Sequence, residues 1–129
     1  MSYVQHRIGG TSPATLHAQV CDPIVDTATG TIIITTQFGR AMMPRTINAS
    51  CTQIGVGGAT LDVQVAAVSI LTAPIAIAAV NVVYAGTFAA SSILPNGTAI
   101  SFIFTNNSGD ATAMQNAKAD LTGEVAHTA

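Results

Sequence analysis

The stretch VQVAAVSILTAPIAIAAVNVVYAGTFAASSILPNGTAISFIFTNNSG, Val63–Gly109, contains no Asp, Glu, Lys, Arg or His. Such a stretch is either hidden from water or divided into strands whose outer faces carry uncharged side chains. Within it, residues 66–83 are apolar almost throughout. On hydropathy alone this window is long enough to cross a bilayer, so a membrane span is the first alternative to consider.

Three features of the window argue against a membrane span. Pro74 and Asn81 interrupt it, no Lys or Arg flanks it to set an orientation, and alternating segments lie on both sides. We therefore predict no membrane partner. The window instead predicts two strands, Ala67–Leu71 and Ile75–Tyr84, which are broken at residues 72–74.

Outside this window, apolar and polar residues alternate in short runs, the pattern of half-buried strands. The last of these runs, Ala119–Val125, has a charged outer face, which is typical of a solvent-exposed strand. The alternating runs are Thr15–Cys21, Arg45–Thr52, Ala59–Val65, Thr98–Thr105 and Ala119–Val125. Thr31–Phe38 is predicted as a strand because it is rich in β-branched residues, and Gly86–Ser92 is expected to continue a strand through Phe88.

Turn signals separate the runs. The cluster Asp26–Gly30 predicts a hairpin between the first two strands. Asn96-Gly97 predicts a tight turn with positive φ at both central positions. Residues 111–117 contain Ala, Met and Gln and are expected to form one helical turn.

The fold class that follows is all-β. We predict a two-sheet antiparallel β-sandwich, jelly-roll-like or immunoglobulin-like, with eight or nine short strands. A chain of 129 residues buries roughly two-thirds of its unfolded surface, enough for one core. Residues 15–125 are expected to form one domain, with an N-terminal arm at 1–14 and a C-terminal tail at 126–129.

The chain carries unusually little charge. Charged residues make up 8% of it, against roughly 25% in typical soluble domains, while hydrophobic residues make up 49%. Such a surface favours permanent contacts with other chains. The candidate interface lies in the arm, at Tyr3, Gln5 and Arg7, and in a predicted loop at Met42, Met43 and Pro44.

The few cations exclude one class of partner. With a net charge of −2, the chain lacks the basic face that binding to nucleic acid requires. Its cations are Arg7, Arg40, Arg45 and Lys118.

The sequence contains no recognisable motif of a catalytic site, and we predict no enzyme activity, no cofactor and no metal site. His6, His17 and His127 are far apart in sequence, and neither a nucleophile elbow nor an HExxH motif is present. The spacing of the glycines at 55, 57 and 58 matches neither of the phosphate-binding motifs GxGxxG and GxxxxGK, so a plain turn is favoured.

The cysteines and the sequons each have a structural interpretation. Cys21 and Cys51 could join two strands by a disulfide. The favoured alternative is two small buried apolar residues, since the first ten residues do not resemble a secretory signal. The N-x-S/T sequons at Asn48, Asn96 and Asn106 are interpreted as residues that serve strands and turns.

Several short motifs lie in the second half of the chain, from Leu61 onward. They are Leu61-Asp62-Val63, Ser69-Ile70-Leu71-Thr72, Pro74-Ile75, Gly97, Ile100-Ser101-Phe102 and Asp120-Leu121-Thr122-Gly123. Together they resemble the β-sandwich domain of small virion proteins of tailed bacteriophages. In that family a "DV…SIL…P-I" block precedes a strand that opens "G-x-x-I-x-F". The family often has a glycine pair before its final strand, where this chain has Ala111 to Lys118, so the subfamily stays open.

The resemblance implies a biological role. Members serve as capsid decoration or cement proteins, head fibres and tail components, commonly as trimers. The expected role is a homotrimeric decoration protein on the capsid surface, assembled in the host cytoplasm, with the major capsid protein and itself as partners. The alternative is a fibre or tail adhesin module that binds a receptor or glycan.

Overall fold

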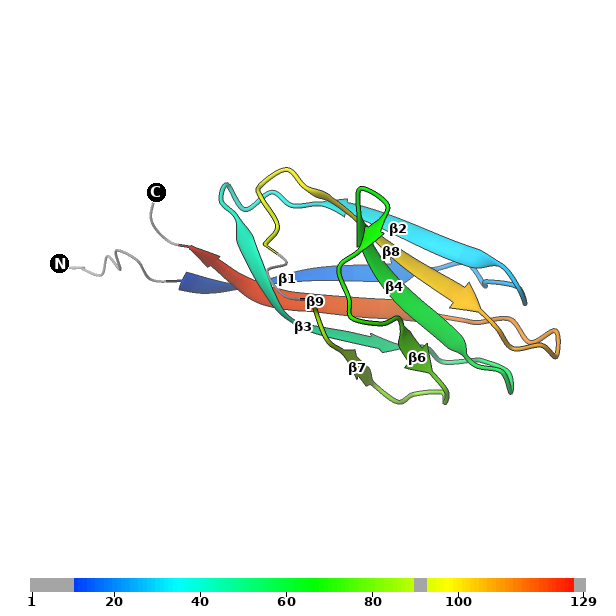
Figure 1. Cartoon of the computed structure of the whole chain (residues 1–129). Coiled ribbons are helices and arrows are strands. Elements are labelled where there is room, and N and C mark those ends of the chain that lie inside the picture. The colour runs from blue at the N-terminus through cyan, green and yellow to red at the C-terminus, as the bar shows by residue number, and fades with distance from the viewer. Residues whose placement is uncertain (1–10, 90–92, 127–129) are drawn as a thin grey trace.

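A computed structural model describes residues 11–89 and 93–126 and shows two antiparallel sheets packed face to face (Figure 1). Described residues form no helix, which confirms the predicted all-β sandwich. The nine strands are β1 Thr11–Val20, β2 Thr29–Thr35, β3 Met42–Ser50, β4 Ala59–Val65, β5 Val68–Ser69, β6 Ile75–Ile77, β7 Tyr84–Gly86, β8 Ala99–Asn106 and β9 Ala117–Ala126.

The strand order is that of a jelly roll. One sheet has the order β1-β9-β3-β7, and the other has the order β2-β8-β4-β5, with β6 also paired to β4. β5 and β6 follow one another along the same edge of β4, so together they take the place of one interrupted strand. The chain changes sheet at every connection except the two that join β4, β5 and β6. This distinguishes a jelly roll from an immunoglobulin sandwich, where several consecutive strands share a sheet.

The core lies between the sheets, where the apolar residues of each alternating run point inward. β4 and β8 pair with Val63 opposite Phe102 and Leu61 opposite Phe104, and all four side chains are fully buried. On the other sheet, Ile47 of β3 lies opposite Leu121 of β9. The period-two pattern therefore assigned inward and outward faces correctly for these strands.

The predicted hairpin between the first two strands is wrong. β1 pairs along its whole length with β9, and β2 pairs with β8, so they lie in different sheets. The connection between them is pinned at Ile24, which exchanges two backbone hydrogen bonds of 2.9 and 2.8 Å with Met114. Ile24 is also buried in the core. This anchor carries the chain from one sheet to the other, and local alternation contains no signal for it.

Two other local predictions need correction. Met42 begins β3 instead of lying in a loop, and it exchanges backbone hydrogen bonds with Leu94. Residues 111–117 form no helical turn, because Ala111 has a positive φ of 66° and Met114 forms a β-bridge. β9 lies centrally between β1 and β3, and its charged outer face is solvent-exposed as predicted, with the side chains of Asp120 and Glu124 46% and 39% exposed.

The Asn96-Gly97 turn is present, but it differs from the predicted type. Thr98 N donates to Pro95 O at 3.2 Å, and of the two central residues only Gly97 has a positive φ, of 85°. This geometry matches type II, which needs a left-handed residue only at its second central position.

The uncharged window is divided much as expected, into shorter strands. Residues 66–83 contain β5 and β6, and the predicted strand Ile75–Tyr84 ends at Ile77. Phe88 forms a bridge with Leu71, while the end of the predicted strand Gly86–Ser92 lies outside the described residues. In the described parts of the chain, 11–89 and 93–126, no helix has the length and hydropathy to span a membrane.

The turn between β4 and β5 allows a stabilising substitution. Ala66 and Ala67 form its two central positions, both in the left-handed region, with φ of 52° and 64°. A left-handed conformation costs a residue with a Cβ about 1–2 kcal/mol, and Asn-Gly is the preferred pair for this turn. We expect Ala66→Asn with Ala67→Gly to raise the free energy of unfolding by about 1–2 kcal/mol, measured by urea denaturation.

Ala76→Gly, in β6, is the control for this turn variant. It places glycine where φ is not positive and is expected to lower stability by about 0.5–1 kcal/mol. An unchanged or lower urea midpoint for the turn variant would contradict the strain inferred at residues 66 and 67.

Candidate functional site

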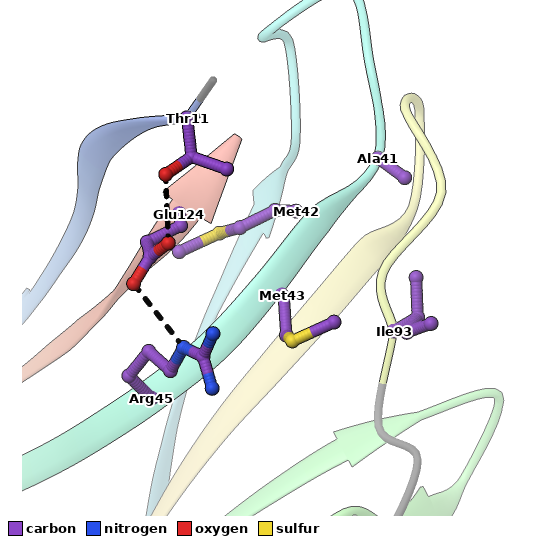
Figure 2. A pocket seen from close by; sticks show the side chains of 7 residues that line it. All are labelled: Thr11, Ala41, Met42, Met43, Arg45, Ile93 and Glu124. Carbon is purple, nitrogen blue, oxygen red and sulfur yellow. Dashed lines mark hydrogen bonds and ion pairs between the residues drawn. The ribbon is translucent and has the colours of Figure 1, made fainter. Parts of the chain in front are cut away.

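A pocket of about 220 Å³ opens where the ends of β1, β3 and β9 meet (Figure 2). Most of its lining is apolar, and the side chains of Met43 and Ile93 are 41% and 52% exposed there. The lining residues are Thr11, Ala41, Met42, Met43, Arg45, Ile93 and Glu124. Exposed apolar side chains beside a hollow are a common feature of surfaces that bind other chains.

The polar wall of the pocket is a small network around Glu124. The Thr11 hydroxyl donates to Glu124 Oε1 at 2.8 Å, and Arg45 Nε lies 3.3 Å from Glu124 Oε2 (Figure 2). The carboxylate is therefore neutralised by a cation and held by a hydroxyl. The lining thus suits an apolar side chain of another chain better than a cation.

A β-bulge places Arg45 in this network. The β3–β9 register shifts between Pro44 and Thr46, so Arg45 has no residue opposite it on β9. The backbones approach closely at this point, because a Cβ on Gly123 would lie 2.2 Å from Met43 O. Glycine at 123 therefore allows the bulge, and the bulge turns Arg45 toward Glu124.

The structure brings together part of the predicted interface. Met42 and Met43 both line the pocket, with Met42 buried and Met43 at the surface, while Pro44 is buried in β3. Tyr3, Gln5 and Arg7 lie outside the described residues. Thr11, the first described residue, lines the pocket, so the arm joins the sandwich at this site.

A second polar pair lies on the outer face of the β1–β9 sheet. His17 lies opposite Asp120, and His17 Nδ1 is 2.6 Å from Asp120 Oδ1. The hydrogen bond to Asp120 raises the pKa of His17 above its ordinary value of 6.5. No group of three His, Cys, Asp or Glu side chains arranged to hold a metal occurs among the described residues.

We expect His17 to titrate above pH 6.5 in the folded protein. Because the folded-state pKa is raised, its stabilisation is complete below about 6.5 and is lost as the pH rises through the folded value. The histidine ring signals, followed by NMR against pH, check this. Asp120→Asn should bring the pKa down, whereas Glu124→Gln should leave it unchanged. A wild-type value at or below 6.5 would refute the assignment.

The two cysteines are free, so the disulfide alternative is wrong. Cys51 is buried as expected, and its burial raises the pKa of the thiol. Cys21 is exposed, which corrects the expectation that both residues are buried.

Asn106 is a structural residue whose importance the sequence did not reveal. Its amide nitrogen donates to Ile24 O at 2.8 Å and to Thr112 O at 2.9 Å. Its amide oxygen accepts from the backbone nitrogen of Ser108 at 2.9 Å and from the Ser108 hydroxyl at 2.6 Å. The side chain is fully buried, so this sequon serves the fold, as expected. Ser108 and Thr112 are close to it in sequence, but Ile24 lies in a distant loop, and no local motif indicates this contact or the burial of the side chain.

Large apolar side chains are also exposed far from the pocket. They occur on β2, on β5 and in several loops, and three lie in the uncharged connection between β6 and β7. Together with Met43 and Ile93 of the pocket, the exposed set is Val25, Ile33, Val56, Val68, Val80, Val82 and Val83.

Comparisons with protein-family models, with curated proteins and with solved structures found no match to this chain.

Proposed function

We propose that this protein is a structural subunit of a virion, a decoration or cement protein that binds the surface of a phage capsid. The observation that carries the proposal is the surface itself. Within residues 11–89 and 93–126, nine large apolar side chains are exposed, and only 8% of the chain's residues are charged. Obligate interfaces are apolar and poor in charge, so such a surface favours coverage by neighbouring subunits.

Two further observations support this role. The jelly-roll strand order recurs in viral capsid domains, although the same fold also serves lectins, so this support is by analogy. The motifs from Leu61 onward resemble small phage virion proteins, whose members commonly form trimers. The proposed protein is accordingly a homotrimer whose second partner is the major capsid protein, and the role involves no catalysis.

The pocket between β1, β3 and β9 is the proposed contact with the shell. It combines exposed Met43 and Ile93 with a neutralised Glu124, so an apolar side chain of the shell can enter without leaving a charge unpaired. Contacts of this kind stabilise a shell by burying surface across the joints between its subunits.

Density-gradient sedimentation of the particle-containing fraction from the natural source tests the proposal. The protein should sediment with shells that contain a major capsid protein. Recovery only in the slow fractions would overturn it. Added back to stripped shells, a Met43→Glu/Ile93→Glu variant should bind at least tenfold more weakly than wild type, and Gln37→Glu, at another exposed position, should bind normally.

The adhesin alternative receives no specific support from the described surface. Glycan platforms use exposed aromatic faces, and Tyr84 is half-buried and packs against the core. Selective binding on a glycan array, lost on Tyr84→Ala, would favour the adhesin role over the capsid role.

A further inference from the structure

β2 is a sheet edge without the usual protection against pairing. It spans Thr29–Thr35, pairs only with β8, and contains no charged residue and no proline (Figure 1). The other edges in the described parts of the chain are protected. β1 carries Pro13 and His17, and β5, β6 and β7 are only two or three residues long. Long, uncharged, β-branched edges are the ones that add another strand.

The core is also incompletely covered along this edge. Ile32 and Ile34 lie opposite Phe102 and Ile100 of β8 and pack against the core, yet they stay half-buried while both partners are fully buried. Ile33, on the outer face, is 64% exposed. A further strand alongside β2 would cover the open flank of Ile32 and Ile34.

The sequence of β2 is matched to itself. Residues 31–35 read Thr-Ile-Ile-Ile-Thr, which is the same in both directions about Ile33. An antiparallel pairing with a two-fold axis at Ile33 therefore sets isoleucine against isoleucine and threonine against threonine. Such β-branched and Thr–Thr pairs stabilise antiparallel sheets. The self-matching sequence selects a second copy of this chain as the partner.

The charges beyond the two ends of β2 agree with this pairing. The nearest charged residue before the strand is Asp26, and the nearest after it is Arg40. Antiparallel pairing brings the start of one strand to the end of the other. The acidic end of each copy then lies near the basic end of its partner, and no like charges meet along the strand.

We propose that β2 is a two-fold self-association edge, through which two copies of this chain join their β2-β8-β4 sheets into one continuous sheet. The contact is isologous, so it differs from the contact that closes a trimer. It does not depend on the proposed virion role. An assembly that uses this edge contains an even number of chains. If the chain also forms the trimer contact, the β2 edge joins the trimers in pairs.

Charge variants at Ile33, measured by light scattering coupled to size exclusion, test the edge. Ile33→Lys and Ile33→Glu each place like charges on the two-fold axis, so each should have half the wild-type mass. Mixing the two should restore the wild-type mass, because opposite charges then meet. Val68→Lys is the matched control, on the opposite edge of the same sheet and 66% exposed, and should keep the wild-type mass.

Wild-type mass for both Ile33 variants would overturn the proposal, as would a wild-type mass that is an odd multiple of 13.0 kDa. Amide hydrogen exchange of the wild-type protein gives a test that needs no variant. Protection of residues 29–35 should rise with protein concentration, and protection that is independent of concentration would also overturn the proposal.

Discussion

Replacing Asn106 by Leu is expected to lower the free energy of unfolding by at least about 3 kcal/mol, because each buried polar group left without a partner costs about 1–3 kcal/mol. Four groups lose their bond to this side chain: the backbone nitrogen of Ser108, the Ser108 hydroxyl, Thr112 O and Ile24 O. Ile24 O keeps a bond from Met114 N, and Ser108 Oγ keeps one from Gly55 N. The network also holds the loop around Ile24. Urea denaturation of the variant and wild type at equal protein concentration measures the loss.

Asn107→Leu is the matched control, since Asn107 is the next residue and is exposed. Its effect should stay within about 0.5 kcal/mol, as for other surface substitutions. Equal stabilities for the two variants would show that the Asn106 network does not stabilise the fold. A circular dichroism spectrum of each variant checks that the sheets still form before stabilities are compared.

Replacing Phe102 by Ala is expected to lower the free energy of unfolding by about 3–5 kcal/mol, the usual cost of removing a buried aromatic ring. Phe102 has no exposed surface and lies in the central strand β8, between Ile32 of β2 and Val63 of β4. The loss combines the transfer of the ring from water with the cavity that it leaves. The midpoint of urea or thermal unfolding measures it.

Ile103→Ala, on the outer face of the same strand, is the comparison. Ile103 is half-buried, so its removal should cost less than half as much as removal of Phe102. A larger loss for Ile103 would mean that the faces of β8 are assigned the wrong way round.

Alternation predicted most of the strands because a strand of this sandwich buries one face. The prediction Ala59–Val65 has the same bounds as β4, and Thr98–Thr105 differs from β8 by one residue at each end. Pairing was not predictable in the same way. β1 pairs with β9, about a hundred residues further along the chain, and β2 pairs with β8, about seventy residues further along. Pairing between such distant segments leaves no local pattern in the sequence.

The candidate site was predictable only in part. Met42 and Met43 were selected as candidate interface residues, and both line the pocket. Their partners Arg45 and Glu124 were not selected, because a β-bulge and a strand far along the chain bring them together. The symmetric sequence of residues 31–35 is visible in the amino-acid sequence, but only the structure shows that β2 lies at a sheet edge.

The central claim is that the uncharged surface belongs to a subunit of an assembly. The stretch Val63–Gly109, which suggested this, forms short strands and loops whose outward residues include Val80, Val82 and Val83. Such side chains lower the free energy of a complex that covers them and give a lone chain no benefit.

The most direct test is the mass of the purified wild-type protein by multi-angle light scattering at micromolar concentration. We predict a single species whose mass is at least twice that of the 13.0 kDa chain. A monodisperse species of 13.0 kDa at every concentration would contradict the claim.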